Sequence, residues 1–250
     1  MKKAKISECE IERYNRQLLI DRWGRKGQEK LKSAKVLVAG IGGLGCPASV
    51  YLTVAGIGTL VLVDNGIIEY SNLNRQILYC EHDIGRHKVD SAVEKLRQLN
   101  PNVDICGFNT EINERTATEL IKNCDVVLDG TDNFETRFII NKACVNLGIP
   151  FLYAAIYGFE ARMMAIIPGK SACLRCMFPF IPSHIHGSPA LGATAGLIAN
   201  LQVIQALKLI TGLGYVAGDL IVLDGESLSF NVFKIQKDPL CSVCGNGTGN

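Results

Sequence analysis

The chain has 250 residues, of which 48% are hydrophobic and 20% are charged. This proportion of apolar side chains is enough to form a hydrophobic core. The composition therefore excludes a disordered chain or a coiled coil. The 26 lysines and arginines nearly balance the 24 aspartates and glutamates, so the net charge of +2 gives no overall attraction to nucleic acid or to an anionic membrane. We therefore expect no nucleic acid and no membrane as a partner.

The N-terminal segment and the longest apolar stretch predict a cytoplasmic protein. Glu8, Glu10 and Glu12 occupy positions where a signal peptide needs an apolar core. The apolar stretch 191–210 is interrupted by Asn200, Gln202, Gln205 and Lys208. These interruptions favour a buried helix over a membrane span.

Predicted strands and helices alternate along most of the chain. Short runs rich in valine, isoleucine and leucine predict buried strands, and longer segments with helical periodicity predict helices. The expected strands are 35–40, 59–63, 103–108, 125–128, 151–156, 161–167, 220–223 and 228–233, and the expected helices are 44–55, 83–99, 114–122, 134–146 and about 191–210. The alternation predicts a doubly wound, Rossmann-like α/β fold whose mostly parallel sheet ends in antiparallel C-terminal strands.

We expect a single domain over residues 1–250. An N-terminal helical arm (1–34) precedes a nucleotide-binding core (35–167). A segment rich in proline, cysteine, histidine and glycine (168–190) indicates an irregular crossover loop. The remainder (191–250) carries the last helix, the last strands and a tail with two cysteines.

A glycine-rich loop follows the first expected strand and opens the next helix. It contains Gly40, Gly42, Gly43 and Gly45. Glycines allow a tight turn and let backbone N–H groups approach a polyphosphate at a helix N-terminus. Asp64 ends the second strand, where a carboxylate can bind ribose. A structural turn would explain the loop alone, but the strand, the helix and Asp64 together predict a nucleotide site, without separating ATP from NAD.

Two cations downstream of this strand favour a triphosphate. Backbone N–H groups can satisfy the two phosphates of a dinucleotide, whereas a metal-bound triphosphate carries more charge and needs side-chain cations. Arg75, in the segment 71–76, has a planar guanidinium that can form two parallel hydrogen bonds to a phosphate. Lys88, at the start of a helix, has a compact ammonium charge. The alternative is that both are solvated surface residues. Their position after a nucleotide-binding strand favours phosphate binding.

A further buried strand is followed directly by Asp132 and Asn133. The carboxyl edge of a parallel sheet is where ligands of such folds bind. The carboxylate of Asp132 is a suitable oxygen ligand for Mg²⁺. Capping of the next helix is the alternative role, and the two roles are compatible.

The ten cysteines divide into two groups. Four form two Cys-x-x-Cys pairs, Cys173/Cys176 and Cys241/Cys244. Their four thiolates would form a closed structural zinc site that attaches the C-terminal tail to the domain. A thioredoxin-like redox pair is the rival for either motif. His184 and His186 are expected to be loop residues, because four sulfurs already suffice. Six cysteines stand singly and are expected to be small buried thiols: Cys9, Cys46, Cys80, Cys106, Cys124 and Cys144.

Several of these motifs together resemble the HesA/MoeB/ThiF family. They are Glu12-Arg-Tyr-Asn-Arg16-Gln, the loop 40–46, Ser71-Asn72-Leu73-Asn74-Arg75-Gln76, Lys88, Thr131-Asp132-Asn133 and the two Cys-x-x-Cys pairs, in order and nearly end to end. This is the family of adenylyltransferases of molybdopterin-synthase and thiamine sulfur-carrier proteins, related to ubiquitin-activating enzymes.

The resemblance implies that the protein uses ATP and Mg²⁺ to adenylate the C-terminal glycine of a small ubiquitin-like (β-grasp) sulfur carrier ending in Gly-Gly, with release of pyrophosphate. It implies ribose binding by Asp64, phosphate binding by Arg75 and Lys88, and Mg²⁺ binding with catalysis by Asp132. It also implies structural Zn²⁺ on the four paired cysteines and a homodimer in which a catalytic Arg16 reaches into the partner's ATP site. The other expected nucleotide-binding residues are the four loop glycines, Ser71, Asn72, Leu73, Asn74, Gln76 and Asn133.

One departure from the family concerns the crossover loop. Family members that continue to a covalent step carry a cysteine there, whereas residues 177–190 offer only Ser183, His184, His186 and Ser188. Hydroxyls and imidazoles trap an acyl group poorly, so we expect the acyl-adenylate to be the product. We also expect an external sulfur donor, because the chain ends soon after Cys244. Two other thiols are disfavoured as nucleophiles: Cys46, at a helix start whose dipole could lower its pKa but which also suits a small packing residue, and Cys80, after the Arg75 segment.

Two rival functions use the same scaffold. An NAD-dependent oxidoreductase would need an acid–base residue at its hydride site, and the sequence offers no clear candidate. A non-catalytic ATP-binding scaffold is disfavoured because Arg75, Lys88 and Asp132 are all present. The sequence leaves open whether the carrier is of the molybdopterin type, the thiamine type or a dual-purpose modifier.

Overall fold

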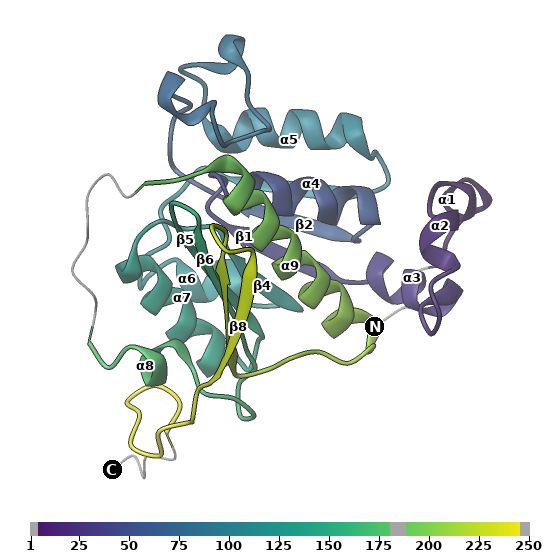
Figure 1. Ribbon diagram of the computed structural model, residues 1–250. Coiled ribbons are helices and arrows are strands. Elements are labelled where there is room, and N and C mark those ends of the chain that lie inside the picture. The colour runs from purple at the N-terminus through teal and green to yellow at the C-terminus, as the bar shows by residue number, and fades with distance from the viewer. Residues whose placement is uncertain (1–4, 181–188, 246–250) are drawn as a thin grey trace.

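One eight-stranded sheet runs through the centre of the molecule (Figure 1). The structure is a computed structural model that describes residues 5–180 and 189–245. The strands lie in the order β3-β2-β1-β4-β5-β6-β7-β8. Their bounds are β1 Lys35–Ala39, β2 Thr59–Val63, β3 Asp104–Phe108, β4 Val126–Asp129, β5 Phe151–Tyr157, β6 Glu160–Ile166, β7 Asp219–Asp224 and β8 Ser229–Lys234. The first five strands pair in parallel and β5 to β8 pair antiparallel, which confirms the predicted Rossmann-like fold.

Helices cover both faces of this sheet (Figure 1). Alternate residues of β1 point to opposite layers. Val36 and Val38 pack in the core beneath α4, α5 and α9, while Leu37 and Ala39 pack in the core beneath α6 and α7. The helices of these layers are α4 Gly45–Ala55, α5 Lys88–Leu99, α6 Ala117–Ile121, α7 Phe134–Leu147 and α9 Gly192–Thr211. A further helix of a single turn, α8 Leu174–Met177, lies between β6 and α9 in the chain.

Helix α9 is, within the described ranges, the one helix long and apolar enough to cross a membrane. Its small residues Ala195, Ala199 and Ala206 are fully buried and allow it to lie close against the sheet and α4. Gln202 is also buried and donates from Nε2 to the backbone carbonyls of Asp129 and Leu152 at 3.0 and 2.7 Å. The helix is therefore part of the protein core, as its polar interruptions predicted.

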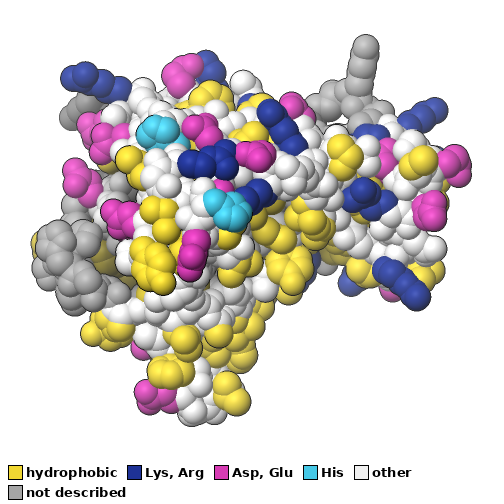
Figure 2. All heavy atoms as spheres, turned by 90° about the horizontal axis from the view of Figure 1, so that it is seen from above, with side chains coloured by type: hydrophobic (Ala, Val, Ile, Leu, Met, Phe, Trp, Pro, Cys, Tyr) yellow, Lys and Arg dark blue, Asp and Glu magenta, His cyan; other side chains and the backbone are white. Residues whose placement is uncertain are grey.

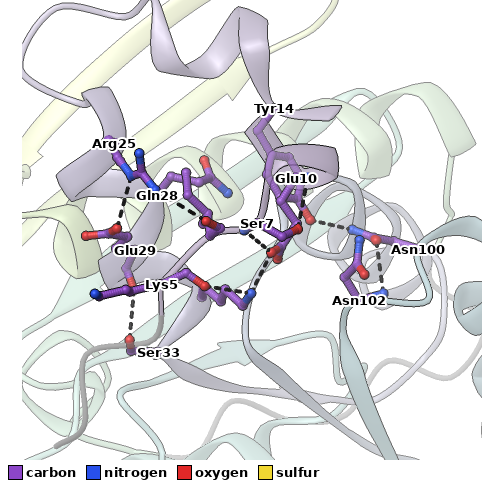
Figure 3. A network of polar contacts seen from close by, with 12 residues as sticks. Lys5, Ser7, Glu10, Tyr14, Arg25, Gln28, Glu29, Ser33, Asn100 and Asn102 are labelled. Carbon is purple, nitrogen blue, oxygen red and sulfur yellow. Dashed lines mark hydrogen bonds and ion pairs between the residues drawn. The ribbon is translucent and has the colours of Figure 1, made fainter. Parts of the chain in front are cut away.

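The N-terminal arm is a compact group of three helices, α1 Glu8–Arg13, α2 Asn15–Leu18 and α3 Gly24–Lys32. It packs at the amino edge of the parallel strands. The Tyr14 hydroxyl accepts a hydrogen bond of 2.9 Å from Nδ2 of Asn100, which precedes β3 (Figure 3). Gln28 Nε2 donates to the carbonyl of Ala55, which precedes β2, at 2.8 Å. Glu10 caps α1 together with Ser7 and pairs with Lys32 at 2.6 Å. The arm is thus fixed to the body although it projects from it (Figure 2).

One local prediction was wrong. The helix expected from residue 83 begins at Lys88, because residues 81–83 form a separate 3₁₀ turn in which Asp83 Oδ2 accepts from the backbone N–H of Cys80. Gly85 then adopts a φ of +86°, a left-handed conformation that ends any continuous helix. Within the crossover segment, the one-turn helix α8 begins directly after Cys173 and includes Cys176.

Candidate active site

A cavity of about 930 Å³ opens at the carboxyl edge of the parallel strands. Its walls come from the ends of β1, β2 and β4, the start of α5, and the hairpin of β5 and β6. This is the edge at which ligands bind in open α/β sheets. The predicted residues that line the cavity are Gly40, Gly42, Gly43, Asp64, Arg75, Gln76, Lys88, Asp132 and Asn133.

The glycine loop between β1 and α4 depends on two close backbone approaches. Gly40 has a φ of +84°, and a Cβ there would lie 2.7 Å from the carbonyl oxygen of Gly130. A Cβ on Gly45 would lie 1.9 Å from the carbonyl oxygen of Gly40. Gly45 does not line the cavity, so its contribution is to let α4 start directly beneath the loop. The N-terminal end of α4 therefore faces the cavity floor.

Asp64 holds this loop in place from the end of β2. One carboxylate oxygen accepts from the backbone N–H of Ile41 at 2.7 Å, and the other accepts from that of Gly66 at 2.7 Å. The side chain is only partly buried and still lines the cavity. Lys88 lies beside the same turn, since its Nζ would be 3.3 Å from a Cβ on Gly66. A carboxylate and an ammonium thus border the same part of the cavity.

The segment before Arg75 forms a turn that orients its guanidinium. Arg75 donates from one terminal nitrogen to the carbonyl of Ser71 and to Oδ1 of Asn74, both at 2.9 Å. Asn72 is buried and accepts from the backbone N–H of Glu69, while Leu73 packs against the core. Ser71, Asn72, Leu73 and Asn74 do not line the cavity. Of the predicted segment, Arg75 and Gln76 alone reach it.

The loop that carries Asp132 rests on a buried ion pair that we did not predict. Asp132 is exposed, and Asn133 caps α7 by accepting from the N–H of Thr136 at 2.9 Å. Below them, Arg137 Nε donates to Asp129 Oδ2 at 2.9 Å, and a terminal nitrogen of Arg137 donates to the carbonyl of Thr131 at 2.6 Å. Burial raises the pKa of Asp129, while Arg137 and Thr131 favour its carboxylate. The pair fixes the loop between β4 and α7.

Further cavity residues also escaped prediction. The segment 110–112 follows β3 and could have been found by the same rule that placed Asp64 at a strand end. Tyr157, Glu160 and Arg162 come from the β5–β6 hairpin. Phe178 reaches the cavity from two residues beyond Cys176, where its ring lies 5.2 Å from that of Phe134. No local motif marks these side chains, because only the tertiary fold brings them to the cavity.

Arg16 lies far from this cavity within its own chain. Its helix, α2, is held at the amino edge, where the neighbouring Gln17 donates to the carbonyl of Ala55 at 3.0 Å. Five-residue strands rising about 3.3 Å per residue place roughly 16 Å of sheet between the two edges. Arg16 is exposed and has no ion pair or side-chain hydrogen bond with residues 5–180 or 189–245. The structure therefore does not bring Arg16 together with the other predicted site residues.

The two Cys-x-x-Cys pairs meet beside α7, where the backbone N–H of Leu174 donates to Asn141 Oδ1 at 3.0 Å. Their sulfur atoms all lie within 4.8 Å of one another, with 3.7 Å between Cys173 and Cys241 and 3.4 Å between Cys176 and Cys244. A tetrahedron of sulfurs about 2.3 Å from zinc has edges of roughly 3.8 Å, so the donor set fits this ion. Burial disfavours the Cys241 thiolate, but the N–H groups of Cys244 and Val243 and the other thiols lower its pKa to about 7. His184 and His186 lie outside the described residues, as do Ser183 and Ser188.

The structure corrects the suggestion that a helix dipole lowers the pKa of Cys46. This residue is fully buried beneath the glycine loop, and its Sγ donates to the carbonyl of Ile41 at 3.4 Å. Burial raises the pKa of the Cys46 thiol to about 12. Cys80, in contrast, is exposed. Cys46 is therefore a packing residue, whereas the expectation of a small buried thiol was wrong for Cys80.

Comparisons with known proteins agree with this architecture. Residues 14–243 match the ThiF family. The chain is 36% identical over 248 residues to the SAMP-activating enzyme E1 of Haloferax volcanii, covering 97% of this chain and 92% of that protein. It is 38% identical over 243 residues to the heterocyst HesA protein of Trichormus variabilis, covering 96% and 91%.

A longer relative and a solved structure extend the comparison. The chain is 40% identical over 248 residues to the adenylyltransferase and sulfurtransferase MOCS3-1 of Drosophila pseudoobscura pseudoobscura. The aligned region covers 96% of this chain but only about half, 55%, of that longer protein. The structure of E. coli MccB with ATP superposes with a TM-score of 0.84 at 27% identity, covering 93% of this chain and 73% of that one. The chain belongs to the ThiF family, alongside relatives named as an activating enzyme E1 and as an adenylyltransferase and sulfurtransferase.

Proposed function

We propose that this protein adenylates the C-terminal glycine of a small ubiquitin-like (β-grasp) sulfur-carrier protein ending in Gly-Gly, using ATP and releasing pyrophosphate. The observation that carries the proposal is the cavity itself, which gathers the glycine loop, Arg75, Lys88 and Asp132 at one sheet edge. It continues past these residues to Tyr157 and Arg162 on the β5–β6 hairpin, which provides space for a peptide tail beside a nucleotide. The ATP-bound MccB neighbour and the E1 relative support this assignment.

The reaction needs charge and alignment more than a general base. A C-terminal carboxylate has a pKa of roughly 3.5, so it is already an anion near neutral pH. One carboxylate oxygen attacks the α-phosphorus of ATP, the bond to the β-phosphate oxygen breaks, and pyrophosphate leaves with the negative charge. Arg75 and Lys88 bind the phosphates and stabilise that charge, and Asp64 binds the ribose. Gln76 and Asn133 complete the nucleotide site.

Two metal ions belong to this proposal. The exposed carboxylate of Asp132 and the adjacent Asn133 offer the oxygen donors that Mg²⁺ prefers, and Mg²⁺ would neutralise phosphate charge there. Zinc on Cys173, Cys176, Cys241 and Cys244 would be structural, because four thiolates leave no open coordination position.

The site is proposed to be shared between two copies of the chain. Arg16 has no partner among the described residues and lies at the sheet edge opposite its own cavity, so a homodimer that places it in the partner's cavity accounts for its position. The acyl-adenylate is proposed to pass to a separate sulfur-donor protein, because residues 177–190 contain no thiol to take the acyl group. We place the protein in the cytoplasm.

ATP–pyrophosphate exchange tests the proposal. Exchange should require the protein, Mg²⁺ and a carrier ending in Gly-Gly, and should vanish with the same carrier amidated at its C-terminus, because amidation removes the nucleophile. Exchange that proceeds equally with the amidated carrier would refute adenylation of the terminal carboxylate. The nicotinamide alternative gains no support from the comparisons, and tight NAD binding without ATP binding would revive it. Co-purification of the native carrier from cells would distinguish the molybdopterin, thiamine and dual-purpose types.

A further inference from the structure

A buried asparagine on α7 connects the four-cysteine cluster to the core of the protein. Asn141 is fully buried, two turns along the helix that Asn133 caps. Its Oδ1 accepts from the backbone N–H of Leu174 at 3.0 Å. Leu174 follows Cys173 directly, so this hydrogen bond fixes the first Cys-x-x-Cys turn against α7.

The other end of the same amide is a donor that lacks a normal partner. Asn141 Nδ2 is buried and makes no hydrogen bond of regular geometry with any residue of the described ranges. The orientation of the amide follows from chemistry, since the Leu174 N–H must face the oxygen and not the NH₂ group. Burial raises the pKa of the Cys173 thiol, and Asn141 is among the neighbouring groups that act against this shift.

A thiol and a thiolate differ greatly as acceptors for this donor. A neutral thiol accepts a hydrogen bond weakly, whereas a charged sulfur accepts one strongly. A buried N–H group without an acceptor is unfavourable, and a metal-bound thiolate beside it would provide that acceptor. Side chains just outside a metal site commonly orient and tune the ligands in this way.

We propose that the Nδ2 group of Asn141 donates a hydrogen bond to the metal-bound thiolate of Cys173, and that this bond sets how firmly the cluster holds its ion. Asn141 is then a positioning residue with two tasks, since its oxygen places the Cys173 turn and its nitrogen stabilises the sulfur. The inference rests on the proposed zinc site. It goes further because it assigns a side chain outside both Cys-x-x-Cys pairs.

The test compares the wild-type protein with Asn141→Asp, which retains the acceptor for Leu174 but loses the donor, and with Asn141→Leu, which loses both. The matched control is Asn146→Leu, on the exposed face of the same helix. Each protein is assayed for bound zinc by elemental analysis and for zinc release to a chromogenic chelator. We expect both Asn141 variants to release zinc about 10–100-fold faster than the wild type and the control. This is the range by which metal binding typically weakens when a side chain that supports a metal ligand is replaced.

A spectroscopic measurement separates this role from a purely structural one. In cobalt-substituted protein, loss of a hydrogen bond to sulfur should move the sulfur-to-cobalt charge-transfer band to lower energy in both Asn141 variants. If the variants fail to fold, cadmium-113-substituted wild-type protein should show scalar coupling from an Asn141 side-chain proton to the metal through Cys173. Unchanged release with an unchanged band, or absence of that coupling, overturns the inference. Wild-type protein without zinc would instead refute the proposed metal site.

Discussion

Arg137 and Asp129 form an ion pair of 2.9 Å directly beneath the loop that carries Asp132. Both side chains are buried, and Asp129 also accepts from the N–H and hydroxyl of Thr131 at 2.9 and 2.6 Å. The exposed Asp132 therefore stands on a rigid base, although its own side chain has no packing role. A substitution at Asp132 can remove its chemistry without removing its support.

Asp132→Ala should abolish adenylation while the fold stays intact. The change removes a proposed oxygen ligand of Mg²⁺, and loss of such an electrostatic contribution costs roughly 10²-fold or more in rate. Pyrophosphate exchange measures the rate, and the thermal midpoint measures the fold. Glu135→Ala, an exposed carboxylate on the first turn of α7, is the control and should exchange normally. Normal exchange by Asp132→Ala would contradict the assignment.

Arg16 should act across a dimer. A mixed dimer of one Arg16→Ala chain and one Asp132→Ala chain contains one complete site if Arg16 serves its partner, and none if it serves its own chain. We therefore expect partial exchange activity from mixed dimers isolated with two different affinity tags. The two parental homodimers are the controls and should both be inactive. An inactive mixed dimer would show that Arg16 does not work in trans.

Replacement of Cys173 or Cys241 by serine should release the zinc and destabilise the protein. Loss of a structural metal costs on the order of 3 kcal/mol, which lowers Tm by roughly 6–12 °C in a chain of this size. Nucleotide affinity should weaken only secondarily, through Phe178, whose ring packs against Phe134 in the cavity wall. Elemental analysis and thermal unfolding provide the two readouts. The buried Cys144→Ser serves as a control that should keep its zinc.

Asp83 should make stability fall in acid. Its carboxylate is buried, which alone would raise its pKa, but hydrogen bonds from Cys80, Lys95 and Ser91 outweigh burial and hold the pKa well below its usual range. A carboxyl group with a depressed pKa in the folded state stabilises the protein above its unfolded pKa, about 3.9. That stabilisation is lost as the pH falls below this value.

Asp83→Asn should therefore cost on the order of 2 kcal/mol at pH 7, because it leaves Lys95 and Arg86 without their shared partner. The same variant should lose less stability than the wild type between pH 5 and pH 3. Denaturant midpoints at the two pH values measure both effects, and the exposed Asp90→Asn on α5 is the control. Equal acid sensitivity of Asp83→Asn and the wild type would exclude Asp83 as the source.

The reaction should stop at the acyl-adenylate, with no thioester to Cys46. A buried thiol with a pKa of about 12 is neither ionised nor accessible at neutral pH. Intact-mass analysis after incubation with ATP and carrier, without reductant, should show no covalent adduct. The exposed Cys80 provides the comparison, and an adduct that is cleaved by thiol and vanishes in Cys80→Ser would contradict the prediction.

The sequence predicts those parts of the site that depend on local chemistry. The glycines of the loop, the acidic residues at the strand ends and the cysteine pairs each require a residue type at a fixed spacing, so a short window reveals them. The predicted start of α5 was wrong because the residues after Asp83 have helical periodicity in the sequence. In the structure the Asp83 carboxylate instead pairs with Lys95 and accepts a hydrogen bond from Ser91. Arg137 and Asn141 were missed because their roles arise from partners that only the fold brings near.

If Arg16 completes the site of a second copy, as proposed, the separation between the N-terminal arm and the cavity makes the activity depend on the concentration of the protein. A site completed by Arg16 of a second copy exists only in assembled pairs, so the rate per chain falls when the protein is diluted below the dissociation constant of the pair. Output then rises more steeply than linearly with expression. In a cell with few copies, most chains would be inactive monomers. A modest increase in synthesis would then raise the total adenylation rate more than in proportion.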